Sequence, residues 1–407
     1  MLWIVNSIYS IGYMRGNQEK HQTRFYVCFA ISIAAAIGIA FAGNLLTLFI
    51  FYEVLTLAHL IHCVDPKAIP QRPVIGARLP GHSAERRPSA LLLPAIIWTY
   101  YARPAQWISY RAGFWHGNIG GPHGSCCWRL FVFGIGKAAV MPVHRWLPAA
   151  MVAPTPVSAL LHAVAVVKAG VFTILKVIIY IFGVEHLFAE PSSGWLLFAA
   201  AFTVLAASVV ALRQTNLKRM LAYSTISQLS YVVMAAAVLK PLSEVGAAVH
   251  IVSHAFGKIT LFFAAGAIYT ASKKTELAEL AGIARRMPWT MAAFSIGALS
   301  MIGVPPTGGF VSKWYILAGA FQDDNYVAIV TIMLSTVLNA AYFLPIVYAA
   351  WLMPETHTPK QDHGEAPWPV VVALTATAAL TLLFFLFNQP VIDLETQLVT
   401  PGSGGSP

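Results

Sequence analysis

Long runs of apolar residues, separated by short polar stretches, set the pattern of this chain. A helix needs about 20 mostly apolar residues to cross a bilayer. Runs of this kind predict membrane spans, in chain order, at 25–43, 44–61, 130–148, 156–183, 195–212, 221–239, 245–270, 290–320, 327–352 and 367–388. The run at 290–320 is long and interrupted. The pattern therefore predicts an all-α, polytopic membrane helix bundle of about 10–11 transmembrane helices.

The composition supports the same class. Hydrophobic residues make up 57% of the chain and charged residues 10%, whereas soluble domains are about a quarter charged. This excludes a disordered protein, a coiled coil and an ordinary cytosolic enzyme. Residues 1–14 look like the end of a further span and lack the pattern of a signal peptide. We therefore expect a chain that is truncated at its N-terminus.

The charges of the loops predict the orientation of the bundle. The loops Arg213–Arg219 and Ala271–Pro288 are rich in Lys and Arg, while the loops at 184–194 and 321–326 lack both. Basic loops stay on the cytoplasmic side of a membrane. The two basic loops are separated by two predicted spans, so both can lie on that side.

Residues 62–129 break the membrane pattern. With Lys67 and seven arginines against Asp65 and Glu85, this segment holds +6 of the net charge of +10. The excess charge is therefore local, and we expect no nucleic-acid partner. Proline and arginine at this density do not suit a membrane helix. One hypothesis is two frameshifted windows, near 59–90 and 102–129; the alternative is a genuine basic loop.

Five ionisable residues lie far from the ends of their apolar runs: Glu53, Lys137, Lys168, Lys258 and Lys313. A charge at the centre of a bilayer costs about 2.5–3.5 kcal/mol. Such residues normally face a wet interior and mark an ion path, and a Lys with a movable carboxylate partner can exchange protons. Glu53 is a candidate partner for Lys137. The alternative, a Lys that snorkels to the membrane surface, suits Lys176 and Lys240.

Histidines extend this set. His250, His254 and Lys258 are spaced i, i+4, i+8, which places them on one face of a helix. Histidine exchanges protons near neutral pH, so this stripe is a candidate relay. A second polar stripe contains Ser224, Gln228 and Tyr231. It either holds water or bonds helices together, and the sequence leaves both options open.

Two apolar runs contain helix-breaking residues beside a lysine. Pro142 follows Lys137, and Pro305 and Pro306 precede Lys313. Proline frees a backbone carbonyl, which is tolerated at membrane depth only inside protein or beside a water-filled cavity. A broken helix in each half of a chain is typical of transporters built from inverted repeats. We therefore predict two broken helices and inverted repeats.

These motifs carry a family resemblance. The stretch GKAAVMPVHRWLPAAMVAPTPVSALLHAVAVVKAG resembles the signature of the antiporter-like proton-translocating subunits of respiratory complex I and of Mrp-type cation/proton antiporters. HIVSHAFGKITLFFAAGAI, GVPPTGGFVSKW and FYEVLTL are similar to its other motifs. The likeness covers about 24–61 and 130–390, and APTPVSALLHAVAVVKAGVF is most similar to the Mrp-type antiporters. It implies two inverted repeats, with the first helices missing and the first repeat altered by 62–129.

The resemblance implies roles for the site residues. Glu53 and Lys137 would form the charge pair of the first half-channel, and Lys168 would connect the two halves. Lys258 and Lys313 would serve the second half-channel. The remaining histidine candidates for proton translocation are His250, His254, His144 and His162.

The expected organisation has five parts. These are membrane helices at 1–61, the aberrant segment at 62–129, and the rest of the first repeat with the start of the second at 130–239. The second repeat with its broken helix follows at 240–352, and a last membrane helix with a polar tail at 353–407.

The predicted function is that of a proton and monovalent-cation translocating subunit of a multi-subunit antiporter. We expect other hydrophobic subunits as partners, H⁺ and Na⁺ or K⁺ as transported ions, and a bacterial inner-membrane location. The sequence has no G-x-G-x-x-G after a strand, no cysteine set for an iron–sulfur cluster and no metal motif, so we expect no cofactor. The alternatives are a proton-pumping subunit of complex I or a related hydrogenase, a stand-alone solute transporter, and a structural anchor.

Overall fold

The computed structural model describes residues 2–19, 22–63, 89–97, 99, 122–189, 193–355 and 364–399. Within these ranges the chain is helical, with one isolated bridge and no named strand. The α-helices, in chain order, are α1 (Leu2–Gly16), α2 (Gln22–Phe41), α3 (Leu45–Cys63), α5 (Pro122–Gly134), α6 (Trp146–Ala149), α7 (Thr155–Val157), α8 (Val166–Lys176), α9 (Val184–Ala189), α10 (Trp195–Leu212), α11 (Leu217–Ala237), α12 (Pro241–Ser272), α13 (Pro288–Ile302), α14 (Gly308–Gln322), α15 (Tyr326–Leu352), α16 (Trp368–Leu386) and α17 (Gln389–Val399).

Short segments of 3-10 helix, which is wound more tightly than an α-helix, and of π-helix, which is wound more widely, connect several of these helices. The 3-10 turns are η2 (Gly136–Ala138), η3 (Val143–Arg145), η4 (Ala150–Val152), η8 (Leu277–Leu280) and η9 (Ile283–Arg285). Two stretches are π-helical, η5 (Ser158–Ala165) and η6 (Val177–Phe182), and they flank α8. With α7 they make one run of 28 residues from Thr155 to Phe182.

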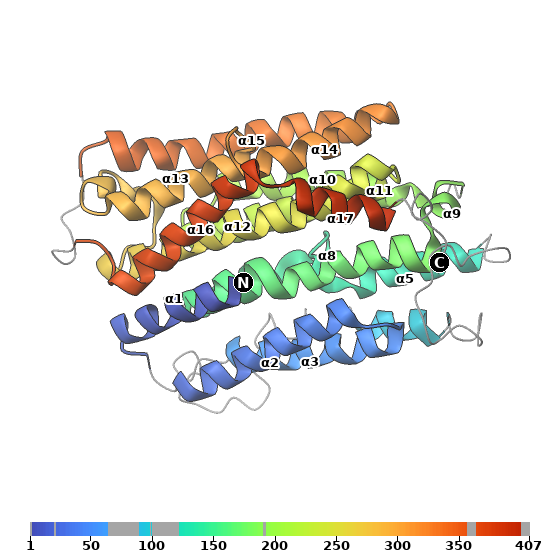
Figure 1. Cartoon of the computed structure of the whole chain (residues 1–407), viewed down its shortest axis with the longest axis horizontal. Coiled ribbons are helices and arrows are strands. Elements are labelled where there is room, and N and C mark those ends of the chain that lie inside the picture. Colours follow the sequence, from blue (N-terminus) through green and yellow to red (C-terminus); the bar gives the residue numbers. More distant parts are fainter. Residues whose placement is uncertain are drawn as a thin grey trace.

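Seven helices in the described part of the chain are long and apolar enough to cross a membrane. Three shorter apolar helices, Leu45–Ala58, Ser125–Gly134 and Pro288–Ile302, occupy further predicted spans. The predicted class, a polytopic all-α membrane bundle, is confirmed. The long helices lie side by side along one axis, with α2 and α3 at one edge and α15 at the opposite edge (Figure 1).

Burial separates central helices from peripheral ones. In the apolar windows of α11 and α12, 89% and 83% of residues are buried, against 33% for α2 and 39% for α15. The outer helices expose large apolar side chains such as Phe202 on α10 and Val337 on α15. In a membrane these faces contact lipid, while α11 and α12 form the protein interior.

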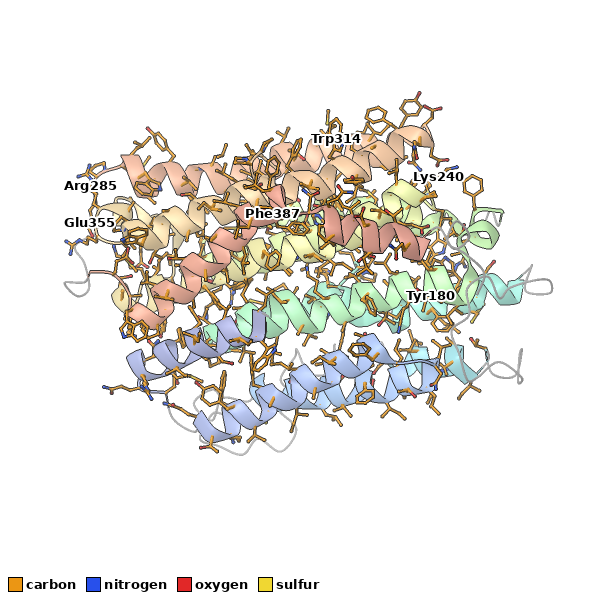
Figure 2. The ribbon with its side chains drawn as sticks, viewed as in Figure 1. Tyr180, Lys240, Arg285, Trp314, Glu355 and Phe387 are labelled. Carbon is orange, nitrogen blue, oxygen red and sulfur yellow. The ribbon has the colours of Figure 1, made fainter. Side chains whose placement is uncertain are left out.

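The two basic loops meet at one end of the bundle. Asn216 pairs with Glu276 in an antiparallel bridge, and the N–H of Leu217 donates to the carbonyl of Thr275 at 3.0 Å. At the other end Lys240 forms an ion pair with Asp323 at 3.0 Å. Figure 2 shows Lys240 at the end opposite Arg285 and Glu355. This arrangement agrees with the predicted orientation of the loops.

Both predicted helix breaks are present. The first follows α5, because residues 135–154 form short 3-10 turns and bends instead of a continuous helix. The prediction of one span over 130–148 is therefore wrong: α5 ends at Gly134 and Pro142 lies in a turn, although the residues are mostly apolar. The second break separates α13 from α14, where Gly303 adopts a left-handed conformation with φ 90°.

The aberrant segment 62–129 falls mostly outside the described residues. Its described parts, 62–63, 89–97, 99 and 122–129, are helical. A Cβ on Gly134 would lie 2.7 Å from the backbone nitrogen of Leu92, so the helix at 89–97 packs tightly against the end of α5. The frameshift hypothesis and the division into five parts stay predictions.

Candidate functional site: a line of buried lysines and histidines

The four lysines singled out in the apolar runs are buried in the protein interior. Their exposed fractions are 2% for Lys137, 7% for Lys168, 0% for Lys258 and 7% for Lys313. Such burial excludes snorkelling to the membrane surface. An ammonium group in this setting needs hydrogen-bond acceptors around it, and each of the four has them.

Lys137 lies in the first helix break, on η2, and faces α3. Its Nζ donates to the carbonyl of Tyr52 at 3.1 Å and to the hydroxyl of Thr56 at 2.5 Å. The Tyr52 ring lies 3.4 Å from Nζ, and the Tyr52 hydroxyl accepts from the backbone N–H of Lys137 at 3.1 Å. The break thus brings the Lys137 side chain into contact with α3, the helix that carries Glu53.

Glu53 is half-buried on α3, between Tyr52 and Thr56 in sequence. One of its carboxylate oxygens, Oε1, is buried and has no hydrogen-bond partner. Among the described residues, no ion pair within 4 Å joins Glu53 to Lys137. Lys137 is therefore bonded to Tyr52 and Thr56, which flank Glu53 in the sequence of α3.

Lys168 on α8 contacts the second half of the chain directly. Its Nζ forms a short contact with Nδ1 of His254 on α12. A neutral imidazole nitrogen accepts a proton from an ammonium group, so this contact joins a proton donor to a proton acceptor. His254 is fully buried, and its other ring nitrogen, Nε2, has no partner.

His250 lies one turn from His254 on the same face of α12. The two ring centroids are 5.8 Å apart. Nδ1 of His250 lies 2.8 Å from the hydroxyl of Ser312, the residue before Lys313 on α14. The predicted stripe of His250, His254 and Lys258 is therefore buried along its length, and it points towards both Lys168 and α14.

Lys258 is fully buried between α12, α11 and α15. Its Nζ donates to the hydroxyl of Ser224 at 2.8 Å and to the carbonyl of Leu221 at 3.2 Å. The Phe343 ring centroid is 5.7 Å from Nζ. Ser224, which the sequence left as either a water site or a helix contact, is thus a partner of Lys258.

Lys313 lies just after the second helix break and reaches back to it. Its Nζ donates to the carbonyls of Met301 at 2.9 Å and Ile302 at 2.8 Å, at the end of α13. The Tyr231 ring centroid is 5.2 Å from Nζ. The positive charge is therefore held by the negative end of a helix dipole.

A chain of hydrogen bonds links Lys258 to Lys313. The Tyr342 hydroxyl on α15 lies 3.0 Å from the hydroxyl of Ser224, and it also contacts Oδ1 of Asn339. Nδ2 of Asn339 donates to the Met301 carbonyl at 3.4 Å. Since Met301 also accepts from Lys313, two lysines on different helices share one polar network.

Sequence reasoning missed Tyr342 and Asn339. A signal was present, because Ser335, Asn339 and Tyr342 repeat the i, i+4, i+7 spacing of Ser224, Gln228 and Tyr231. Glu244 on α12 was also missed: it is 1% exposed, and neither carboxylate oxygen has a partner. In the second stripe, Tyr231 bonds the Ile332 carbonyl at 3.4 Å, while both polar atoms of the Gln228 side chain are buried without a partner.

Two further predicted histidines lie near the first break. His144 is half-buried on η3, its ring is 6.4 Å from that of Tyr223, and its Nδ1 has no partner. His162 belongs to the π-helical η5, and its side chain lies outside the described residues. π-Helical turns inside α-helices are frequent at functional sites. Here η5 directly precedes the helix that carries Lys168.

Tight packing fixes the two breaks. A Cβ on Gly170 would lie 2.3 Å from the Ala138 nitrogen and 2.4 Å from the Lys137 carbonyl carbon, so α8 packs directly on η2. A Cβ on Gly309 would lie 1.8 Å from the Ser300 carbonyl oxygen, so α14 packs directly on α13. These contacts hold the backbone at Lys137 and Lys313 in place.

The site is built from groups that can move protons. Lysines, histidines and hydroxyl groups exchange protons through hydrogen bonds. The described residues contain no group of three His, Cys, Asp or Glu side chains placed to hold a metal ion.

Comparisons with known proteins agree with this geometry. The sequence pattern of the family described as "NADH:quinone oxidoreductase/Mrp antiporter, TM" matches residues 42–339. The chain is 30% identical over 413 residues to the NADH-quinone oxidoreductase subunit N of Desulforudis audaxviator, covering 97% of this chain and 80% of that protein. It is 37% identical over 221 residues to subunit L of Rickettsia bellii, covering 54% of this chain but only 33% of that protein.

Solved structures give the same fold. A chain of the Mrp complex from Dietzia sp. DQ12-45-1b superposes with a TM-score of 0.81 at 19% identity, covering 98% of this chain and 80% of that one. A chain of the archaeal membrane-bound sulfane sulfur reductase superposes with a TM-score of 0.76 at 22% identity, covering 92% and 75%. The resemblance predicted from the motifs is confirmed: this integral membrane protein belongs to the NADH:quinone oxidoreductase/Mrp antiporter transmembrane family.

Proposed function

We propose that this chain is a proton-translocating subunit of a multi-subunit cation/proton antiporter, and that protons move along its buried lysines and histidines near the middle of the bilayer. The observation that carries the proposal is the contact between Lys168 and His254. It joins the part of the chain that bears Lys137 to the part that bears Lys258 and Lys313. Without such a contact, the part of the chain that bears Lys137 and Lys168 would have no polar link to the network of Lys258 and Lys313.

The chemistry of each group fits a step in this path. Lys137, bonded to the residues that flank Glu53 in the sequence of α3, belongs to the first half-channel. Lys168 passes protons to His254, and His250 leads on to Ser312 beside Lys313. Lysine and histidine side chains held by hydrogen bonds can release and regain a proton, so each site can empty and refill.

The partners and location are part of the proposal. The relatives named above include subunits of respiratory complexes and a chain of an Mrp complex. We infer that this chain assembles with other hydrophobic subunits in a bacterial inner membrane and that H⁺ and Na⁺ or K⁺ are the transported ions. We expect each of the two inverted repeats to hold one lysine beside its break: Lys137 near Pro142, and Lys313 near Pro305 and Pro306.

A second candidate is a proton-pumping subunit of an NADH-quinone oxidoreductase. The match to subunit N, over 97% of this chain, favours it. Both candidates use the same buried path and differ in what drives it. An antiporter exchanges H⁺ for a cation without NADH, whereas an oxidoreductase pumps protons only when quinone is reduced elsewhere in the complex.

The test is a transport assay in inverted membrane vesicles that contain the assembled complex. Addition of Na⁺ or K⁺ after acidification should release protons in the antiporter, and NADH should drive acidification in the oxidoreductase. Lys137→Ala should abolish either activity. Lys176→Ala is the matched control, because Lys176 bonds the carbonyls of Ala40 and Ala42 at the edge of the bundle, away from the buried path. Full activity of Lys137→Ala in an assembled complex would contradict the proposal.

A further inference from the structure

The end of α13 presents an unusual set of acceptors to Lys313. After the left-handed Gly303, the N–H groups of Gly303 and Val304 both donate to the carbonyl of Leu299. The last carbonyls of a helix have no partner within the helix. Those of Met301 and Ile302 accept the ammonium of Lys313 instead, at 2.9 and 2.8 Å.

The charge on Lys313 is balanced by oxygen dipoles rather than by an acid. Among the described residues, no carboxylate forms an ion pair with Lys313. Main-chain carbonyls at the end of a broken helix are also the ligands that hold Na⁺ in membrane transporters. An ammonium group and an alkali cation carry the same charge and use the same hard oxygen acceptors.

Further oxygen ligands lie on the neighbouring helices. Asn339, which donates to Met301, has Ser335 one turn away on α15. Gln228 lies one turn from Tyr231, whose ring is 5.2 Å from the Lys313 ammonium. Both polar atoms of the Gln228 side chain are fully buried and have no hydrogen-bond partner, and the Ser335 hydroxyl is fully buried near Tyr231. Unpartnered buried oxygens of this kind are expected where an ion or water binds.

We propose that the carbonyls of Met301 and Ile302, together with the polar side chains of Asn339, Ser335 and Gln228, form a binding site for a monovalent cation, which the ammonium of protonated Lys313 occupies. Na⁺ or K⁺ enters when Lys313 has lost its proton and its side chain has withdrawn. The proton on Lys313 and the bound cation therefore exclude one another at this site. This inference rests on the proposed exchange of protons for cations, and it names the site of that exchange.

Other titratable groups face this site. Tyr231 on α11 contacts Lys313 directly, His250 on α12 reaches it through Ser312, and Tyr342 on α15 reaches it through Asn339. The helices α13 and α16, which also pack against α14, carry no titratable residue. Glu244 on α12 is also buried where α12 packs against α14, so Lys313, His250 and Glu244 are the groups able to confer pH dependence near neutral pH.

The test is cation binding to the purified, detergent-solubilised full chain, without partner subunits and without transport. Lys313→Met removes the ammonium and keeps the length of the side chain. It should bind ²²Na⁺ saturably, with a rise in unfolding temperature of about 2–4 °C in NaCl or KCl over choline chloride. Lys258→Met is the matched control, since the Leu221 carbonyl already accepts from the Thr225 hydroxyl, and it should gain no cation binding. Folded Lys313→Met protein that binds no cation would overturn the proposal.

The wild-type chain supplies a second test if Lys313→Met does not fold. Its ²²Na⁺ affinity should rise by about tenfold per pH unit while Lys313 is protonated, because each bound cation releases one proton. His250→Asn should keep this dependence if Lys313 is the competing group. Affinity that is independent of pH in both proteins would overturn the proposal. These binding results are separate from transport, so a chain that pumps but binds no cation would refute only this inference.

Discussion

The ammonium of Lys168 on α8 lies against Nδ1 of His254 on α12, although the two residues are 86 positions apart in the chain. Both are buried, and His254 continues to His250 and, through Ser312, to the helix of Lys313. The contact therefore connects Lys168, on the first half of the chain, to the polar groups that lead to the second helix break.

A double-mutant cycle tests whether this contact carries protons. Lys168→Met and His254→Leu should each slow proton translocation by about 100-fold, because each removes one proton-transfer group from a serial path. The double variant should be no slower than either single variant. The measurement is the initial rate of vesicle acidification, normalised to assembled complex. Losses that multiply would mean that the two residues act independently.

The Tyr342 hydroxyl should matter for both stability and transport. Tyr342→Phe leaves Oδ1 of Asn339 without its donor inside the protein. Leaving a buried polar group unsatisfied costs about 1–3 kcal/mol. The unfolding temperature of the purified chain should fall, and translocation should slow. Tyr348→Phe, at a side chain on α15 that is 54% exposed, is the control and should leave both unchanged. Equal behaviour of the two variants would remove Tyr342 from the network.

Gly170→Ala should disturb Lys137 without touching its side chain. The new methyl group would meet the backbone of η2 at 2.3–2.4 Å, so α8 and η2 would have to move apart. Overpacking of this kind costs about 1–3 kcal/mol. Thermal unfolding should show the loss of stability, and transport should fall with it. Gly43→Ala meets nothing within 4 Å and serves as control; a Gly170→Ala protein as stable as Gly43→Ala would show that the two segments are loosely packed.

A surface ion-pair cluster gives a pH-dependent prediction outside the membrane spans. Partial burial opposes ionisation of Glu355, but the hydrogen bond and charge of Arg286, at 2.9 Å, and the charge of Lys274, at 3.5 Å, outweigh it and lower the pKa of Glu355. A lowered pKa in the folded state stabilises the protein above the unfolded-state pKa of about 4.3. The gain is lost as the pH falls through the folded-state pKa.

Glu355→Gln isolates this contribution. At pH 7 the loss of the partly exposed Arg286 pair should lower stability by about 1 kcal/mol or less. The total loss should be larger, because Lys274, whose side chain is 2% exposed, loses the carboxylate that balances its charge. The difference from wild type should shrink as the pH falls below about 4. Thermal unfolding across this pH range measures it, with Asp324→Asn as a control at an exposed carboxylate. A difference that is constant with pH would assign the effect to packing.

Apolar run length predicted most of the spans, because a helix that crosses a membrane must be apolar over its whole length. The run at 195–212 corresponds to α10, Trp195–Leu212. The same reasoning failed at 130–148, since hydropathy reports burial rather than helicity. Ala138, Ala139 and Val140, just before Pro142, are apolar and buried, but they lie in 3-10 or irregular backbone.

The lysines were found from the sequence because a charge in an apolar run is costly and needs a reason. The hydrogen-bond partners of these lysines were not found from the sequence. Tyr342 and Asn339 carry no charge and do not stand out in an apolar helix, and the contact of Lys168 with His254 depends on which helices pack together. Glu244 lies near the start of α12, where a carboxylate is ordinary, and only the structure shows that it is buried.

The most direct test of the buried path is the rate of proton translocation by the complex that carries Lys168→Ala. Lys168 is the only one of the four lysines in contact with a histidine among the described residues, so the path has no alternative connection there. The account predicts a complex that assembles normally and translocates protons at less than about a hundredth of the wild-type rate. Translocation near the wild-type rate by assembled Lys168→Ala complex would contradict it.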